Sequence, residues 1–497
     1  MRVAIAYLFL SLLPSSTIGL NNFFNKLAMS KPSSSSSSSS PSSGVQTSII
    51  TSSSVASSLP SWDILTAQAM NTEFGVSWTE QQTLREKGAG TPHTDCKVRL
   101  FGTTGEPRIT YYRDNAAWCP YCQKVWILLE EKQIPYRVEK INMRSYGDKP
   151  PEFLRMVPNG LLPAIKIDNS QVQTDSLQIM LNLEQMYSGP NHKQMWPSTG
   201  SPEAERASNL MRLERALFGA WCNMVFRPPG KREIQQFEFT MSQVEEQLQV
   251  TSSPWFLEDF SIVDLTYITH VERMAASVAY WTGFKIRGEG KWPCIETWMA
   301  AFEDMPSYMA TKSDYYTHVM DIPPQYGPGY FGEDNKYASV IEGSDGLSWS
   351  LPLPPLSDSN DVVEPIRPNN NPGEKKARDE AAVKLVRNHE AVVKFACRGA
   401  GTVGVKRFQA PLADPYAIAN LNYKEDVDCL LRYTVHALLD GYENVSLLES
   451  TGGDEKSRSE LKNCVRYLQQ RIGVPRDMSY PAARQLRAHL GYVMDKI

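Results

Sequence analysis

The sequence has no excess of positive charge. Its 497 residues include 51 basic and 55 acidic side chains, which gives a formal net charge of −4 at pH 7. Residues 1–62 hold three of the basic side chains and no acidic one, so the rest of the chain carries 48 basic against 55 acidic groups. Proteins that bind nucleic acids more often show a basic excess or a basic stripe. We therefore expect no nucleic acid among the partners.

Long apolar runs and internal repeats are also lacking. Beyond residue 13 no apolar run approaches the ~20 residues that span a bilayer, and no repeat with a period of about 20–50 residues is visible. These absences argue against a solenoid and, for the mature form, against a membrane protein. Hydrophobic residues make up 41% of the chain, which is enough for large cores.

Cysteines are few and widely spaced. Only Cys119 and Cys122 lie close together, whereas small disulfide-dependent secreted domains have a much denser pattern. The spacing favours a reducing or redox-active compartment. The other six cysteines are Cys96, Cys222, Cys294, Cys397, Cys429 and Cys464.

The N-terminal segment has the composition of a targeting sequence. Residues 3–13 form an apolar run of signal-peptide length. The segment that follows contains an eight-serine tract from Ser33 to Ser40, continues rich in serine to Ser61 and meets its first acidic residue at Asp63. A signal-like part followed by a transit-like part resembles the two-part presequence of algae whose plastids lie behind extra membranes. We therefore expect residues 1–62 to be a disordered presequence and the location to be the plastid. Secretion with a serine-rich, glycosylated stalk is the alternative.

The middle of the chain alternates between strand and helix patterns and then becomes helical. From Arg108 the order β-α-β-α-β-β-α fits into about 80 residues, which is typical of a thioredoxin-like domain. Four amphipathic helical segments follow residue 202, one of which opens at Ser261 with Asp264 at capping-box spacing. Nine prolines between residues 322 and 373 predict a linker or surface strap, and apolar helix faces after residue 427 predict a C-terminal helical bundle.

Four residues carry the chemistry, Cys119-Pro120-Tyr121-Cys122, directly after a predicted strand and at the start of a helix. The unpaired N–H groups and the positive end of the helix dipole stabilise a thiolate there, so Cys119 is the predicted nucleophile. Cys122 lies one turn further on the same face, at the start of an apolar stripe, and is suited to resolve a mixed disulfide. Two alternatives are a zinc half-site, although no second pair of ligands with zinc spacing is present, and a structural buried pair.

This combination resembles the cysteine-containing glutathione transferases, with omega-class transferases, dehydroascorbate reductases and glutaredoxin-like transferases as the nearest groups. The resemblance spans Arg108 to about Met309 and implies glutathione as co-substrate and no metal. It assigns catalysis to Cys119, a glutathione carboxylate to Lys149, the cysteinyl unit to Leu162 and a cis Pro163, and the γ-glutamyl group to Asp175 and Ser176. Elementary chemistry agrees for the last pair. The Asp175 carboxylate can accept from the ammonium group of the γ-glutamyl unit, and Ser176 with the N–H groups of the helix it starts can donate to its carboxylate.

The sequence also departs from the family pattern. Glutaredoxins have a lysine a few residues before the catalytic cysteine, whereas Asp114 to Trp118 stand here, which leaves Arg113 or Lys124 as helpers of the thiolate. Most transferases of this kind lack a second cysteine, so Cys122 shifts the expectation toward disulfide chemistry. The implied activity is that of a glutathione-dependent thiol-disulfide oxidoreductase or transferase acting on a small electrophile, a disulfide or a glutathionylated protein. A homodimer is usual for the fold.

The fold class that follows is a thioredoxin-like α/β domain, an all-α transferase domain and an additional C-terminal helical bundle. The alternative function is a redox-sensitive scaffold that uses the transferase fold and the C-terminal helices to recruit a plastid partner. The expected segments are the presequence (1–62), an N-terminal extension (63–107), the glutathione-binding domain (108–190), the helical domain (202–320), the Pro-rich strap (321–373) and a helical extension (374–497).

Two weaker motifs lie in the helical extension. Gly399, Gly401 and Gly404 have the spacing of a dinucleotide-binding loop, but the segment before them reads as a helix and prolines follow, which favours a flexible turn. Residues 374–409 are rich in basic side chains and are expected to form a solvated helix face rather than a contact for an anionic partner.

Aromatic residues of the helical domain, namely Trp255, Tyr280, Trp281, Trp292 and Trp298, could line a co-substrate pocket or pack in the core.

Overall fold

The computed structural model describes residues 59–168, 170–228, 230–404, 411–445 and 453–497. Nearly all of the predicted presequence, residues 1–62, lies outside the described residues. Its last residue is ordered, however, because helix α3 (Trp62–Met70) begins at Trp62 and is capped by the side chain of Ser61, which accepts from Ile64 N. Where the presequence ends stays a prediction.

A five-stranded sheet forms the centre of the first domain, in the order β1-β3-β2-β4-β5. The central strand β2 (Ile109–Asp114) runs parallel to β3 (Tyr136–Ile141) and antiparallel to β4 (Ala164–Ile167), which pairs with β5 (Gln173–Thr174). The short edge strand β1 (Val98–Arg99), which the sequence patterns did not predict, pairs with β3. Helices α5 (Pro120–Glu131), α6 (Pro151–Met156) and α7 (Ser176–Met186) complete a thioredoxin-like fold and confirm the predicted element order.

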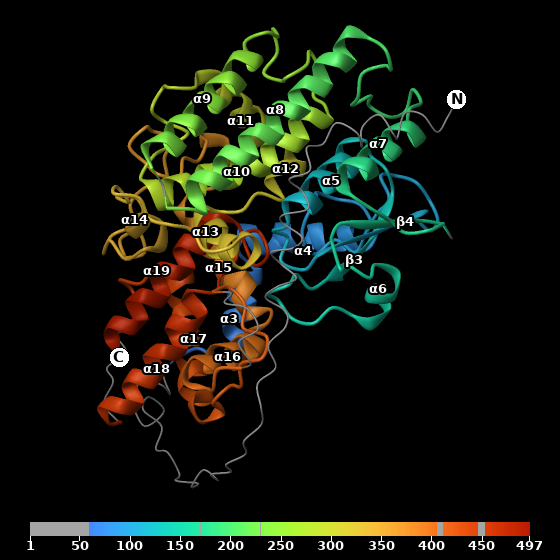
Figure 1. The fold of residues 1–497 in the computed structure, drawn as a ribbon. Coiled ribbons are helices and arrows are strands. Elements are labelled where there is room, and N and C mark those ends of the chain that lie inside the picture. Colours follow the sequence, from blue (N-terminus) through green and yellow to red (C-terminus); the bar gives the residue numbers. More distant parts are fainter. Residues whose placement is uncertain (1–58, 169, 229, 405–410, 446–452) are drawn as a thin grey trace, which may run out of the picture. The chain divides into compact units, whose positions relative to one another are not determined.

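A helical domain follows, drawn in green and yellow in Figure 1. The apolar faces of its first two helices are largely buried, as expected of amphipathic helices on a core. One hydrophobic cluster runs without a break from the sheet through these helices. The helices are α8 (Pro202–Val225), α9 (Lys231–Leu248), α10 (Ile262–Thr282), α11 (Pro293–Glu303), α12 (Pro306–Met309) and α13 (Tyr315–Tyr326).

The capping box predicted at the start of α10 is present. The buried Asp264 carboxylate accepts from Ser261 N at 2.9 Å and Ser261 Oγ at 2.8 Å. It also accepts from Phe256 N and from Trp298 Nε1, both at 3.1 Å, so it ties the helix start to the preceding loop and to α11.

We expect Asp264→Ala to lower the free energy of unfolding by about 3–5 kcal/mol, because four buried donors lose their acceptor at once. Ser261→Ala removes one of these donors and should cost about 1 kcal/mol. Chemical denaturation of both variants measures the difference. Equal effects of the two substitutions would contradict the role given to Asp264.

The Pro-rich segment is more structured at its start than predicted. Helix α13 continues through Pro323 and Pro324 in its last turn and ends only before Gly327, whose φ of 107° few other residues adopt. Helix α14 (Ala338–Glu342) and the 3₁₀ turn η1 (Pro368–Asn370) interrupt the rest. The segment lies as a strap on the helical domain, since Lys285 bonds to the carbonyl of Asn360 and Arg367 donates to the carbonyl of Ala300 at 2.9 Å.

The C-terminal helices have a hydrophobic core of their own, and the N-terminal extension completes it. Leu65 and Ala69 of α3 and Trp78 of α4 (Glu73–Glu86) belong to this second core, and Figure 1 shows the blue α3 among the orange and red helices. Trp62 donates from Nε1 to Asp428 at 2.7 Å. The helices are α15 (Glu374–Val386), α16 (His389–Ala396), η2 (Cys397–Ala400), η3 (Leu421–Tyr423), α17 (Lys424–Asp440), α18 (Glu455–Gln469) and α19 (Tyr480–Lys496).

The two weaker motifs of this region have structural explanations. The three glycines allow close backbone packing, because a Cβ at Gly399 would stand 2.2 Å from the carbonyl of Asn463, and one at Gly401 1.8 Å from that of Ile418. The segment before them is the helix α16, as expected. The basic stretch is not simply a solvated face, since Lys384 lies 3.7 Å from the centre of the Trp78 ring.

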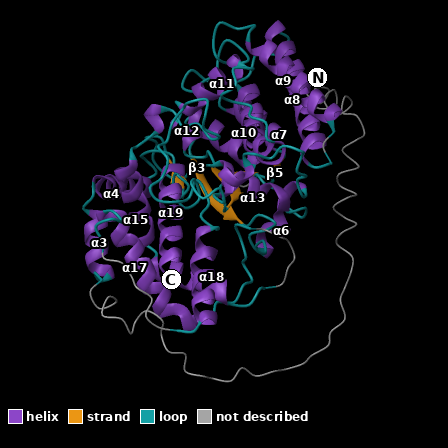
Figure 2. Ribbon diagram, turned by 90° about the vertical axis from the view of Figure 1, so that its left-hand side faces the viewer, coloured by secondary structure: helices purple, strands orange, loops and turns teal. Residues whose placement is uncertain are grey.

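Figure 2, turned by 90°, shows the strands enclosed by helices. Among the described residues, no helix combines the length and the hydropathy needed to cross a membrane.

Candidate active site

Cys119 lies at the junction between β2 and α5. It is the N-cap of α5, Pro120 occupies the first helical position, and the Cys119 carbonyl accepts the first helical bond, from Gln123 N at 2.9 Å. Proline suits this position because its missing N–H would have no helical partner there. The Cys119 side chain is partly exposed, with its sulfur 4.0 Å from the carbonyl oxygen of Leu162. The site is therefore the helix start that the sequence predicts, with a cysteine that is not fully buried.

Cys122 lies one turn further along and is 1% exposed. Burial, and then the contact with the Cys119 thiol, raise the pKa of Cys122 well above its usual value. Tyr111 of β2 donates from its hydroxyl to the Cys122 carbonyl at 2.7 Å and holds this turn against the sheet. The two cysteines thus differ as a nucleophile and a resolving thiol should, because one residue is partly exposed and the other is buried.

Asp114, at the end of β2, is the third polar group here. One oxygen of its carboxylate and the sulfurs of Cys119 and Cys122 all lie within 4.8 Å of one another. A structural zinc site has four ligands, and no fourth histidine, cysteine or acidic group joins this cluster in the described part of the chain. Asp114 also accepts from Trp118 N at 2.7 Å. This bond closes the loop that leads into residues 119–122, which we call the catalytic turn.

Leu162, Pro163 and Lys149 lie beside the cysteine pair. The Leu162–Pro163 peptide bond is cis, as the resemblance implied. Lys149 bonds to the carbonyl of Asn142, and burial is the main reason that its pKa is lowered, against an opposing electrostatic effect of Cys119. Its ammonium group is therefore within electrostatic range of the thiol.

Asp175 and Ser176 stand at the start of α7. Asp175 has a φ of 75°, a conformation that L-residues rarely adopt, and it is the N-cap, because its Oδ1 accepts from Leu177 N at 3.0 Å and Gln178 N at 3.1 Å. Ser176 is buried. Sequence reasoning treated the aspartate only as a ligand group, although aspartate before a helix is also a capping signal.

The two suggested helpers of the thiolate differ. The Arg113 guanidinium donates to the carbonyls of Thr94 at 2.7 Å and Asp114 at 2.8 Å and stacks on Trp126, so it is committed to structure. Lys124 is buried, which lowers its pKa to about 8, while Asp175 and Cys119 both oppose this shift. Lys124 is therefore the better candidate for an electrostatic partner of a Cys119 thiolate.

A buried polar network behind Trp118 was not predicted. Trp118 donates from Nε1 to His318 Nδ1 at 3.1 Å, and His318 Nε2 donates to Glu272 at 2.7 Å. Glu272 also accepts from Gln123 Nε2 at 3.0 Å, and Arg273 bonds to the Trp118 carbonyl. Helices α10 and α13 thereby hold both sides of the catalytic turn. These residues are 150 to 200 positions away from the turn, so no local pattern indicates the contacts.

The aromatic side chains near the site are not those singled out in the sequence. Trp292 and Trp298 are buried in the core, and Trp255 packs on Phe260 and Phe302. Of the two interpretations, a co-substrate pocket or core packing, these three residues fit core packing. Tyr326 instead contacts a group of rings that includes Trp118, with centroid distances between 5.4 and 6.4 Å. The other rings of this group are Phe218, Trp221 and Phe226.

His270, which sequence reasoning interpreted as a packed or hydrogen-bonded residue, is buried and bonds through Nδ1 to Glu214 at 2.6 Å. That interpretation is confirmed.

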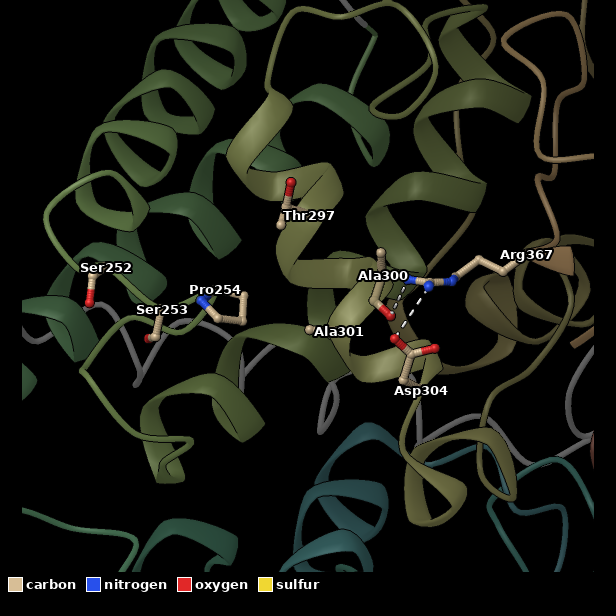
Figure 3. A pocket seen from close by; sticks show the side chains of 8 residues that line it. All are labelled: Ser252, Ser253, Pro254, Thr297, Ala300, Ala301, Asp304 and Arg367. Carbon is tan, nitrogen blue, oxygen red and sulfur yellow. Dashed lines mark hydrogen bonds and ion pairs between the residues drawn. The ribbon is translucent and has the colours of Figure 1, made fainter. Parts of the chain in front are cut away.

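A surface pocket of about 470 Å³ lies elsewhere, between the strap and α11 (Figure 3). Its one ion pair, between Arg367 and Asp304 at 3.3 Å, is satisfied within the protein. No cysteine or histidine lines it, so the chemistry belongs to the Cys119 site. The lining residues are Ser252, Ser253, Pro254, Thr297, Ala300, Ala301, Asp304 and Arg367.

A thiol at a helix start, opposite a cis proline in a thioredoxin-like domain, defines a thioredoxin-like thiol protein. Residues 118–186 match the family model described as "Glutathione S-transferase, N-terminal domain". The likeness to this family therefore covers the part of the chain that holds the cysteine pair, the cis proline and the start of α7.

Three similar proteins illustrate the extent of the likeness. "Glutathione S-transferase DHAR2" of Arabidopsis thaliana is 41% identical over 75 residues, 15% of this chain and 33% of that protein. "Glutathione S-transferase DHAR3, chloroplastic" of the same species is 39% identical over 72 residues, 14% of this chain and 26% of that protein. The crystal structure of glutathione transferase Omega 3C from Trametes versicolor has 23% identity and a TM-score of 0.37, and the match covers 42% of this chain and 86% of that one. The chain thus spans about a third or less of the length of the two plant relatives.

Proposed function

We propose that the protein is a glutathione-dependent thiol-disulfide oxidoreductase or transferase in which the Cys119 thiolate is the nucleophile. The observation that carries this proposal is the placement of a partly exposed cysteine at the N-cap of α5, with a second, buried cysteine one turn behind it. Cys119 attacks a disulfide, a glutathionylated protein or an electrophilic carbon and forms a covalent mixed disulfide or adduct. Bound glutathione or Cys122 then releases the product.

The tripeptide has a consistent set of partners in this proposal. The cysteinyl unit pairs with the backbone of Leu162 beside cis Pro163, which brings its sulfur next to Cys119. A carboxylate meets Lys149. At the other end, the γ-glutamyl group meets Asp175 and the helix start at Ser176, where N–H groups favour an anion. The likeness to proteins named as glutathione S-transferases supports glutathione as the co-substrate.

The plastid is the proposed location, supported by the composition of residues 1–62 and by the likeness over 72 residues to a protein named chloroplastic. The homodimer expected from the resemblance stays a prediction.

The proposal is tested by exposing the Cys122→Ser chain to oxidised glutathione and measuring its intact mass, followed by peptide mapping. We expect one glutathione adduct, confined to Cys119 and removed by reduced glutathione. Cys222 and Cys294 are internal controls, because both are partly exposed and both have a raised pKa caused mainly by burial. Adducts spread over these thiols, or none at Cys119, would refute the proposal.

The scaffold alternative has one supporting observation, the separate core of the C-terminal helices. Residues 374–497 alone are unsuitable for testing whether these helices capture a partner, because they lack the side chains of α3 and α4 that fill this core. Partner capture therefore has to be measured with the whole chain. A chain that ends near Asp321 is also unsuitable, since it removes the last turn of α13 with Tyr326.

A further inference from the structure

Three basic side chains gather at one tryptophan ring where helix α4 of the N-terminal extension lies beside α15 (Figure 2). The Arg85 guanidinium of α4 lies 4.7 Å from the centre of the Trp78 ring. From the end of α15, Lys384 Nζ lies 3.7 Å and the Arg387 guanidinium 4.9 Å from the same ring centre. We call Arg85, Lys384 and Arg387 the basic cluster, which belongs neither to the Cys119 site nor to the pocket of Figure 3.

Unlike its neighbours on the same two helices, the basic cluster has no acidic partner. Lys376 of α15 pairs with Glu73 of α4 at 2.6 Å. No side chain of the cluster forms an ion pair or a hydrogen bond with another described residue. Arg85 is only 7% exposed, and its Nε and Nη1 are buried without an acceptor. A buried donor without an acceptor costs free energy, so a ligand that supplies acceptors is favoured here.

A histidine next to the cluster shows how positive this place is. His93 stands edge-on to the Trp78 ring, with the two centroids 5.1 Å apart. Burial is the first cause that lowers the pKa of His93 to about 2, and the three cluster side chains and Lys140 all act in the same direction. His93 Nδ1 accepts from Asp95 N at 3.0 Å, so its neutral ring carries the hydrogen on Nε2. The imidazole therefore adds a donor to this place and no negative charge.

Two acidic side chains lie nearby without neutralising the cluster. Burial lowers the pKa of Lys384 to about 8, and Glu380 of α15 opposes this shift, but its carboxylate accepts from Ser479 N at 2.7 Å and from Ser479 Oγ at 2.6 Å. Asp95 acts on Arg85 and Lys384 electrostatically and without a direct contact. Aromatic ring faces attract cations but do not cancel their charge. Three positive charges therefore share one exposed carboxylate.

We propose that the basic cluster is a binding site for a phosphate group. A guanidinium presents a planar fork of N–H groups that matches two phosphate oxygens, and an ammonium group adds a point charge with three donors. Three positive charges also favour a dianion over a singly charged carboxylate. The His93 Nε2–H is one more donor for a phosphate oxygen. The bound anion joins α4 to α15 and thereby stabilises the N-terminal extension on the C-terminal helices.

Isothermal titration calorimetry of the full chain with inorganic phosphate tests this site, at a constant ionic strength set with chloride. We expect one phosphate per chain to bind with a dissociation constant below about 1 mM. Arg387→Gln and Lys384→Gln should each weaken binding about 10- to 100-fold, because each removes a charge-assisted contact. Thermal unfolding is a second readout, since phosphate should raise the unfolding temperature of the unsubstituted chain more than that of either variant.

Lys376→Gln is the matched control. It removes one positive charge from the same helix, but Lys376 is already paired with Glu73, so this variant should bind phosphate as tightly as the unsubstituted chain. Because Arg387 is exposed, Arg387→Gln should fold normally. Without phosphate it should unfold at the same temperature as the unsubstituted chain or slightly above it, because one of three like charges is gone.

Glycerol 3-phosphate in place of inorganic phosphate identifies the source of the anion. Tighter binding of the ester assigns the site to a small phosphorylated metabolite, and equal or weaker binding assigns it to free phosphate. No saturable binding of either anion, or an equal loss of affinity in Lys376→Gln and Arg387→Gln, overturns the proposal. Cys119 takes no part in this assay, so the result is independent of the proposed function.

Discussion

Replacing Cys119 by serine is expected to lower glutathione-dependent turnover by roughly 10³- to 10⁶-fold, while the protein stays folded. The start of α5 can stabilise a thiolate, but a serine hydroxyl stays protonated at neutral pH and forms no mixed disulfide. The substitution is nearly isosteric, and Cys119 is not part of the closely packed core, so a large effect on stability is not expected. Steady-state kinetics and the intact-mass assay measure the loss.

Cys122→Ser is the matched control, one helical turn away. It should retain glutathione-dependent activity, because bound glutathione can release the product in place of the second thiol. The intramolecular disulfide, by contrast, can no longer form. A fully active Cys119→Ser protein would contradict the assignment of the nucleophile.

Replacing Arg487 by methionine is expected to lower the free energy of unfolding by about 3–5 kcal/mol. Arg487 of α19 and Asp314, the N-cap of α13, form an ion pair at 2.6 Å in which both side chains are at most 1% exposed. The guanidinium also donates to the carbonyl of Ile472 at 2.8 Å and stacks on Tyr316. Without it, the Asp314 carboxylate is buried and unpaired. Chemical denaturation measures the change.

This substitution should also reduce activity, although α19 is far from Cys119 in the sequence. Asp314 caps α13 through Thr317 N at 2.9 Å, and α13 carries His318, which bonds to Trp118 beside the nucleophile. Arg484→Met on the same helix is the control, because Arg484 makes one exposed bond to the strap and its loss should cost less than about 1 kcal/mol. Equal stability of the two variants would show that the buried pair does not hold α13.

Local sequence signals account for the catalytic turn. A β-prone run, a cysteine, a proline at the first helical position and a second cysteine one turn on define the strand, the cap and the helix without any distant contact. The N-cap role of Asp175 was equally readable, since aspartate is among the preferred caps. The resemblance was needed for the cis bond at Pro163, because sequence spacing alone does not distinguish the two isomers.

Other features depend on contacts that no short window contains. Prolines at 323 and 324 suggested that the helical domain ends there, yet tertiary packing carries α13 through them. Residues 63–86 carry apolar helix faces that no neighbour in the sequence covers, and their partners lie more than 280 residues further on, in α15 and α17. Trp255, Trp292 and Trp298 have the same local character as Trp118 and Trp221, and only the packing shows which group lies near the thiol.

By itself the sequence determined the thioredoxin-like domain, the helices that follow it and the chemistry of Cys119, because helix periodicity, capping and thiolate stabilisation act within a few residues. Only the tertiary structure decided what surrounds that thiol: the Asp114 carboxylate beside it, the Trp118, His318 and Glu272 network behind it, and the link through α13 to Arg487. The physical reason is that burial and hydrogen bonding of polar groups depend on which distant side chains come within about 3 Å, and such contacts leave no periodic trace in a sequence.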